Sequence, residues 1–157
     1  MSQILQMPGV PETSKQLLVR LLQEDLIPIE ALKAVVESYR RVIHEASRRN
    51  GRANGALGDQ IADSLQLLLA RINDLTGPDN LQIIQAAVRY FVIQNDGSGH
   101  DLESEDGLYD DARVVNAVLH YFGLDRLKIQ NLPAPASNRR PPVRGGAAAP
   151  RDVSRGG

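Results

Sequence analysis

The chain has 157 residues, a formal net charge of -1, 42% hydrophobic residues, 4% aromatic residues and no cysteine. This size predicts one domain with a substantial core, and the absence of thiols excludes disulfides, thiolate-bound zinc and iron–sulfur clusters. The longest apolar runs span only a few residues, far fewer than the ~18 that a membrane-crossing helix needs. Because the first residues show no basic stretch followed by an apolar one, we expect no signal peptide, no integral membrane segment and a cytoplasmic protein.

Helical spacing of apolar residues begins after the proline- and glycine-rich residues 8–11. It predicts a first helix over 12–24 and a second helix over 28–49, with Pro28 in the first turn, where its missing N–H is tolerated. Because the apolar stripe of the second helix is expected to exceed what one small bundle can cover, we expect that the chain can form a homodimer. The stripe consists of Leu32, Val35, Val36, Tyr39, Val42, Ile43 and Ala46.

A third helix is predicted after a glycine- and asparagine-rich segment. Residues 50–58 contain three glycines and two asparagines, which indicates a flexible connection. Asp59 is the expected N-cap of the helix, whose apolar face extends to Leu75. We expect Gly77 to end this helix in the left-handed conformation, with Pro78 preventing its continuation.

Two further apolar stripes predict a fourth helix over 79–94 and a fifth helix that Asp110 opens and Gly123 ends. No alternation of period two bounded by turns is present, so the predicted fold is all-α. The expected architecture is a compact bundle of about five amphipathic helices. Six aromatic residues on or beside these helices are expected in the core, namely Tyr39, Tyr90, Phe91, Tyr109, Tyr121 and Phe122.

The charge of the chain is divided between a body over 1–130 and a tail over 131–157. The tail holds five arginines and one aspartate, a charge of +4, so the body carries -5. Its proline-, glycine- and alanine-rich composition predicts disorder. It is either a solubilising tail or a basic arm that contacts a partner, with Arg139, Arg140 and Arg144 as candidates. We do not expect nucleic-acid binding, because the body would repel phosphates and no aromatic residue is interleaved with the arginines.

The histidines, serines and carboxylates form no recognisable catalytic motif. His44 begins the zinc-protease pattern H-E-x-x-H, but Arg48 stands where the second histidine is required. We therefore expect no enzyme and no cofactor. A small hydrolase that uses carboxylates such as Asp96, Asp106 and Asp111 stays an alternative, and it would need a pocket that holds these groups together.

The most distinctive segment is 95–111, which holds seven carboxylates between two predicted helices. Aligned with a calcium-binding EF-hand loop, it puts Gly99 at the turn and Glu105 at the bidentate twelfth position. Two positions depart from that pattern, because Gln94 is a poor first ligand and Asp101 replaces the aliphatic eighth residue. The competing interpretation is a solvated loop whose last two acids cap the next helix. The ligands of calcium or another divalent cation would be Asp96, Ser98, Asp101 and Glu105.

Residues 84–124 also carry a family resemblance. The apolar stretch 86–93 contains a tyrosine, and 107–115 reads Gly-Leu-Tyr-Asp-Asp-Ala-Arg-Val-Val. These features resemble the YkvA-like family, a bacterial domain of unknown function in which a tyrosine-containing helix precedes an acidic loop, a glycine, an aromatic residue, two aspartates and a second helix. The Ile-Pro-Asp element of that loop is replaced by Gly-Ser-Gly-His at 97–100. The resemblance implies a helix–loop–helix pair, and the family has no settled activity to transfer.

Together these patterns predict a non-enzymatic helical protein that binds another protein, as an adaptor or in an assembly. The acidic loop 95–111, the basic tail or both are the expected contact regions. The alternative is a helical module that binds a divalent metal ion in the acidic loop. The candidate partner-binding residues are Asp106, Tyr109, Asp110, Asp111, Arg139, Arg140 and Arg144.

Overall fold

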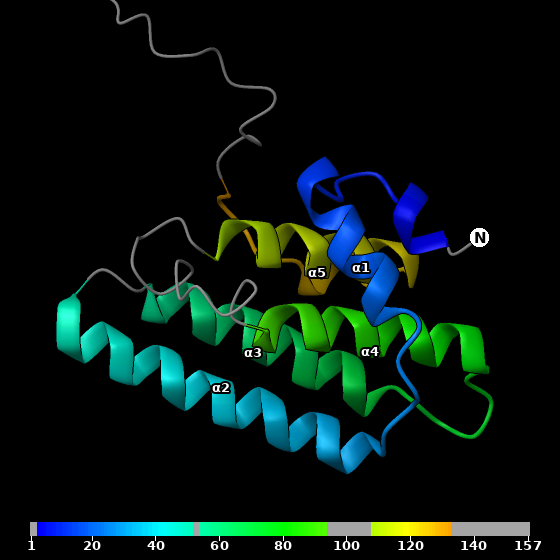
Figure 1. Cartoon of the computed structure of the whole chain (residues 1–157), viewed down its shortest axis with the longest axis horizontal. Helices are drawn as coiled ribbons and strands as arrows, with labels where there is room; N and C mark the ends of the chain where they lie inside the picture. The colour runs from blue at the N-terminus through cyan, green and yellow to red at the C-terminus, as the bar shows by residue number, and fades with distance from the viewer. Residues whose placement is uncertain (1–2, 52–53, 94–107, 133–157) are drawn as a thin grey trace, which may run out of the picture.

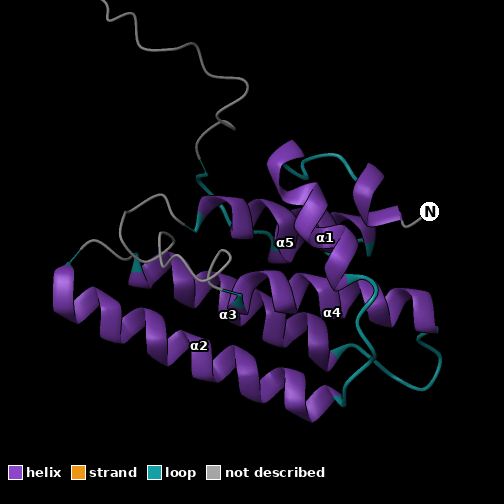
Figure 2. Ribbon diagram, viewed as in Figure 1, coloured by secondary structure: helices purple, strands orange, loops and turns teal. Residues whose placement is uncertain are grey.

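The computed structural model describes residues 3–51, 54–93 and 108–132. This part of the chain contains five α-helices, three short 3-10 helices and no strand, which confirms the predicted all-α bundle (Figure 2). The predicted disorder of the tail falls outside the described residues. The α-helices are α1 (Lys15–Leu21), α2 (Ile29–Asn50), α3 (Gly55–Ala70), α4 (Pro78–Val92) and α5 (Tyr109–Tyr121).

Helices α2 to α5 lie side by side and alternate in direction, as in an up-and-down four-helix bundle (Figure 1). Helix α2 contacts α3 and α4, and α5 contacts α3 and α4, while the short α1 packs on α4. No helix in the described part of the chain is long and apolar enough to span a membrane.

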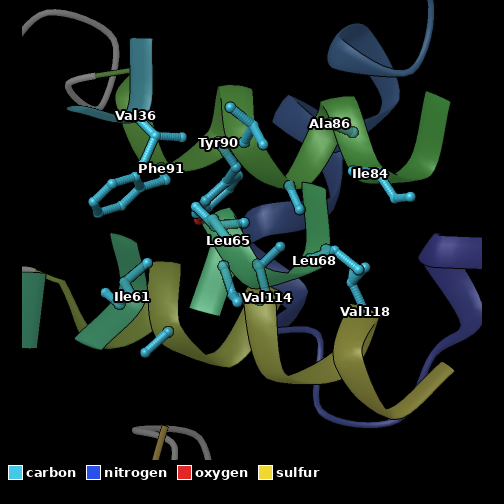
Figure 3. Close-up of a cluster of buried hydrophobic side chains, with 14 of the residues drawn as sticks. Val36, Ile61, Leu65, Leu68, Ile84, Ala86, Tyr90, Phe91, Val114 and Val118 are labelled. Atoms are coloured by element: carbon cyan, nitrogen blue, oxygen red, sulfur yellow. The ribbon is translucent and has the colours of Figure 1, made fainter. Parts of the chain in front are cut away.

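The core lies between the four long helices, and every α-helix contributes to it. Tyr39 of α2 meets Phe91 of α4 edge to face, with ring centroids 5.1 Å apart. The bundle covers most of the apolar stripe of α2 and leaves Val42 38% exposed. The physical reason for expecting a dimer at that stripe therefore does not hold. Figure 3 shows a part of the core, formed by Val36, Ile61, Leu65, Leu68, Ile84, Ala86, Tyr90, Phe91, Val114 and Val118.

The expected burial of all six aromatic residues is wrong at one position. Tyr121, in the last turn of α5, is 40% exposed. Its ring packs edge to face on that of Phe122, with centroids 5.0 Å apart. Phe122 is partly buried and packs against the core, whereas Tyr121 does not belong to it.

The first helix is shorter than predicted, because residues Glu12–Ser14 form a 3-10 helix and α1 ends at Leu21. The chain then continues in an irregular conformation to α2, held by the buried side chain of Gln85 on α4. Gln85 Nε2 donates to Asp25 O at 2.8 Å, and its Oε1 accepts from Ile27 N at 2.9 Å. These bonds satisfy backbone groups that a longer helix would have paired internally.

The boundaries predicted for the third helix are wrong at both ends. Helix α3 begins at Gly55 because Asn54 caps it, with Oδ1 accepting from Leu57 N at 3.0 Å. It ends at Ala70, so Leu75 lies beyond the helix and is 92% exposed. Gly77 has φ -74° and is the extended N-cap of α4, with Pro78 in the first helical position.

The predicted end of the last helix is confirmed, because Gly123 follows α5 with φ +73°, a left-handed conformation that suits glycine. Its predicted cap is wrong. Leu108 is the N-cap and makes no side-chain capping hydrogen bond, and Asp110 lies within the first turn of the helix. The acidic residues contribute instead through their position at the positive end of the helix dipole.

Candidate functional site

The described candidates for partner binding gather at the N-terminal end of α5, around Arg113. The Asp110 carboxylate accepts a hydrogen bond from Arg113 Nη1 at 2.9 Å. The Arg113 guanidinium carbon lies 5.8 Å from the centroid of the Tyr109 ring, within range of a cation–π contact. Asp111 points inward and is only 2% exposed. The structure therefore brings Tyr109 and Asp110 together at the surface and separates Asp111 from them.

A hollow of about 380 Å³ adjoins this cluster. It lies between the N-terminal segment, α5 and the segment that follows α5. Arg113 forms part of its wall, and the Arg113 side chain is only 10% exposed. The lining residues are Pro8, Gly9, Arg113, Asn116, Ala117, His120, Lys128 and Leu132.

The segment after α5 is fixed along this helix by Asn116. Asn116 Nδ2 donates to Ile129 O at 3.0 Å, and Oδ1 accepts from Ile129 N at 2.7 Å. Both backbone groups of Ile129 are thereby satisfied by one side chain. This pair of hydrogen bonds holds the segment against α5, and Leu132, the last described residue, lies at the wall of the hollow.

The basic side chains around the hollow have carboxylate partners. His120 Nδ1 lies 2.7 Å from Asp125 Oδ1, and Lys128 Nζ lies 3.1 Å from the same atom. The hydrogen bond with His120 is the main reason why the pKa of Asp125 is lower than usual, and Lys128 acts in the same direction. The hollow is therefore electrostatically balanced, and it presents no nucleophile with an adjacent base.

The described residues contain no group of three histidine, aspartate or glutamate side chains that could hold a metal ion. The carboxylates of the predicted divalent-metal site, and most of those of the alternative hydrolase, fall in the segment 94–107, outside the described residues. Asp106 and the tail arginines also lie outside them. The predicted residues concerned are Asp96, Ser98, Asp101, Glu105, Asp106, Arg139, Arg140 and Arg144.

A polar network between α2 and α3 was not foreseen from the sequence. Arg40 Nη1 lies 3.0 Å from Asp59 Oδ1, and its Nη2 lies 2.8 Å from Asp63 Oδ1. Glu37 also binds the same guanidinium, and His44 Nε2 lies 2.8 Å from Asp59 Oδ1. Asp59, expected as a helix cap, thus joins two helices from within α3. The spacing of Glu37 and Arg40, three residues apart on one helix, was the one visible signal.

A second unforeseen contact joins the start of the chain to the core. Ser14 Oγ and the Tyr90 hydroxyl are 2.6 Å apart, and both side chains are buried. Arg89 of α4 pairs with Glu24 at 2.9 Å just after α1. These residues are 65 to 76 positions apart in the chain. No local pattern could reveal them, and their role is to attach α1 to α4.

No protein-family model matches this chain, and neither the curated proteins nor the solved structures give a match. The resemblance of residues 84–124 to the YkvA-like family stays a prediction.

Proposed function

We propose that the protein is a non-enzymatic interaction module that binds a partner protein at the N-terminal end of α5. The proposal is supported by where charge is placed in the chain. Six of the 18 basic and six of the 19 acidic residues fall outside the described residues, which leaves 12 basic and 13 acidic residues in the folded part. The described bundle therefore has a net charge close to zero. The excess acidic and basic residues lie in two other segments, one between α4 and α5 and one after the bundle.

These segments have opposite signs. Residues 94–107 contain five acidic and no basic residues, whereas residues 133–157 contain five arginines and one aspartate. Charge separated in this way steers a partner with a complementary distribution and fixes its orientation more than it raises affinity. A neutral folded body adds no opposing long-range field.

The single observation that carries the proposal is that both segments join the bundle at Arg113. Asp110, just after the acidic segment, binds the Arg113 guanidinium at 2.9 Å. Leu132, the second residue of the tail and the last described one, lines the hollow whose wall Arg113 forms. Two described residues close to the two charged segments, Asp110 and Leu132, thus lie on either side of one arginine and one hollow, and this supports a common contact area for a partner.

The test is capture of partners by the full chain from cells that encode it, followed by calorimetric titration with the captured protein. We expect Asp110→Asn and deletion of residues 133–157 each to weaken binding, and high salt to weaken it further. Glu30→Gln is the matched control, because Glu30 is also an exposed acid paired with a basic residue three positions later, Lys33, on α2. Equal affinity for the wild type, both variants and the control would refute the proposed site.

A further inference from the structure

The opposite end of the bundle presents an apolar side chain on a well-built turn. Leu75, between α3 and α4, is 92% exposed, the most exposed large hydrophobic residue of the described chain. Its backbone N–H donates to Asn73 Oδ1 at 2.7 Å, and Thr76 Oγ1 accepts from Asn73 N at 3.2 Å. These side-chain bonds fix the turn, so Leu75 is held outward by the local structure.

A hollow with apolar walls and a partly polar lining, which includes Arg71, Asn73, Thr76 and Asn80, lies directly beside this projecting leucine. Its volume is about 310 Å³, and an apolar cavity of ~150 Å³ already accepts a benzene-sized group. A leucine side chain therefore fits into it. Its apolar walls come from α3, α4 and the end of α5, namely Leu68, Ile72, Ile84, Phe122 and Leu124, with Leu75 at the rim.

Exposed charges of both signs lie in or next to the α3–α4 turn and form no ion pair among the described residues. Arg71 follows α3 and lines the hollow, Asp74 belongs to the turn, and Asp79 lies in the first turn of α4. The ion pairs elsewhere in the described bundle involve other residues. This face thus has a projecting apolar side chain, a hollow that can receive such a side chain, one cation and two anions.

We propose that this face binds a second copy of the chain about a twofold axis. In such an arrangement the Leu75 side chain of each copy enters the hollow of the other, and Arg71 faces the acidic residues of the other turn. A twofold interface requires one surface that contains both members of every complementary pair, which is what this face contains. An unrelated partner would need only one member of each pair.

The dimer face is distinct from the site proposed for the partner protein. Figure 1 shows the α3–α4 turn and the C-terminal end of α5 at one end of the bundle, and the N-terminal end of α5 toward the other. A dimer formed in this way would leave both partner sites accessible. It would present two copies of the proposed site, and the inference does not depend on that site being correct.

Sedimentation equilibrium of the full chain over a wide concentration range tests the inference. We expect a reversible dimer, and Leu75→Asp should weaken it at least ~30-fold, because the loss of one central anchor has about that effect and each dimer would lose two. Leu67→Asp is the matched control, because Leu67 is a 50% exposed leucine of α3 that does not line the hollow. A wild-type chain that stays monomeric up to about 1 mM, or equal weakening by both variants, would overturn the proposal.

Charge reversal distinguishes a second copy from any other cause of association. Arg71→Glu alone should weaken the dimer, because it faces the acids of the other turn. Combination with Asp74→Arg or with Asp79→Arg should restore it, since each reversed pair is again complementary. Failure of both combinations to restore the dimer would overturn the twofold arrangement. Capture of the partner protein by Leu75→Asp should be unchanged, so the two proposals fail separately.

Discussion

Gly58 of α3 offers the sharpest test of how closely α2 and α3 approach. A Cβ added at Gly58 would lie 2.9 Å from Ile43 Cδ1 and 3.0 Å from Ile43 Cγ2. Ile43 is 1% exposed, so it cannot swing into solvent to make room. Gly58→Ala therefore forces a shift of Ile43 or a separation of the two helices, although alanine normally favours a helix.

The two effects have opposite signs and can be compared. Replacing glycine by alanine within a helix stabilises by ~1 kcal/mol. Adding a methyl group to a closely packed core costs ~1–3 kcal/mol. We expect the cost to prevail, with Gly58→Ala lowering the free energy of unfolding by ~1 kcal/mol. For a domain of this size that corresponds to a fall in Tm of roughly 3–5 °C.

The assay is thermal and urea unfolding followed by circular dichroism. Gly55→Ala is the control on the same helix, since its added Cβ would lie 3.6 Å from the His44 ring, an ordinary contact. We expect it to be neutral or stabilising by ~0.5 kcal/mol. Ile43→Val removes Cδ1 and should make Gly58→Ala less costly in the double variant. Gly58→Ala as stable as Gly55→Ala, or strict additivity with Ile43→Val, would refute this reasoning.

Three further predictions concern polar contacts that hold the bundle together. Tyr90→Phe leaves the buried Ser14 hydroxyl without its 2.6 Å partner and should lower the free energy of unfolding by ~1–2 kcal/mol, measured by urea unfolding. The pKa of Asp59 is lowered, chiefly by the hydrogen bond with His44, so its contribution to stability is present at neutral pH and is lost as the pH falls through the folded-state pKa. Unfolding free energies between about pH 5 and 2 should fall less steeply for Asp59→Asn than for the wild type, and parallel curves would contradict this. Asn116→Ala should accelerate amide hydrogen exchange in the segment after α5 without unfolding the bundle. Unchanged exchange would show that the two hydrogen bonds between Asn116 and Ile129 do not hold this segment.

The existence of each helix follows from apolar spacing, but the residues at which several helices begin or end do not. Asn54 and Asp59 are both favourable N-caps, and local chemistry does not choose between them. The choice was settled by Arg40 and His44 on α2, which bind the Asp59 carboxylate and leave Asn54 as the cap. Likewise, apolar spacing continues past Ala70 to Leu75, although the helix does not.

The candidate site was only partly accessible to sequence reasoning. The signal for Tyr109 and Asp110 was an aromatic residue and two acids before a predicted helix, and they do lie at the start of α5. For Arg113 the one signal was its position three residues after Asp110 on a helix, which indicates a local ion pair and does not reveal the hollow. Its importance comes from Leu132, which reaches the same hollow from 19 positions further along the chain.

The sequence by itself determined the helical class, the stop at Gly123 and the separation of acidic from basic charge, because each depends on residues close together in the chain. Only the tertiary structure decided which polar groups meet, such as Ser14 with Tyr90 and Arg40 with Asp59. It also decided that Leu75 faces outward. Contacts between distant segments depend on how helices pack, and one-dimensional spacing contains no information about the partner that each helix face will meet.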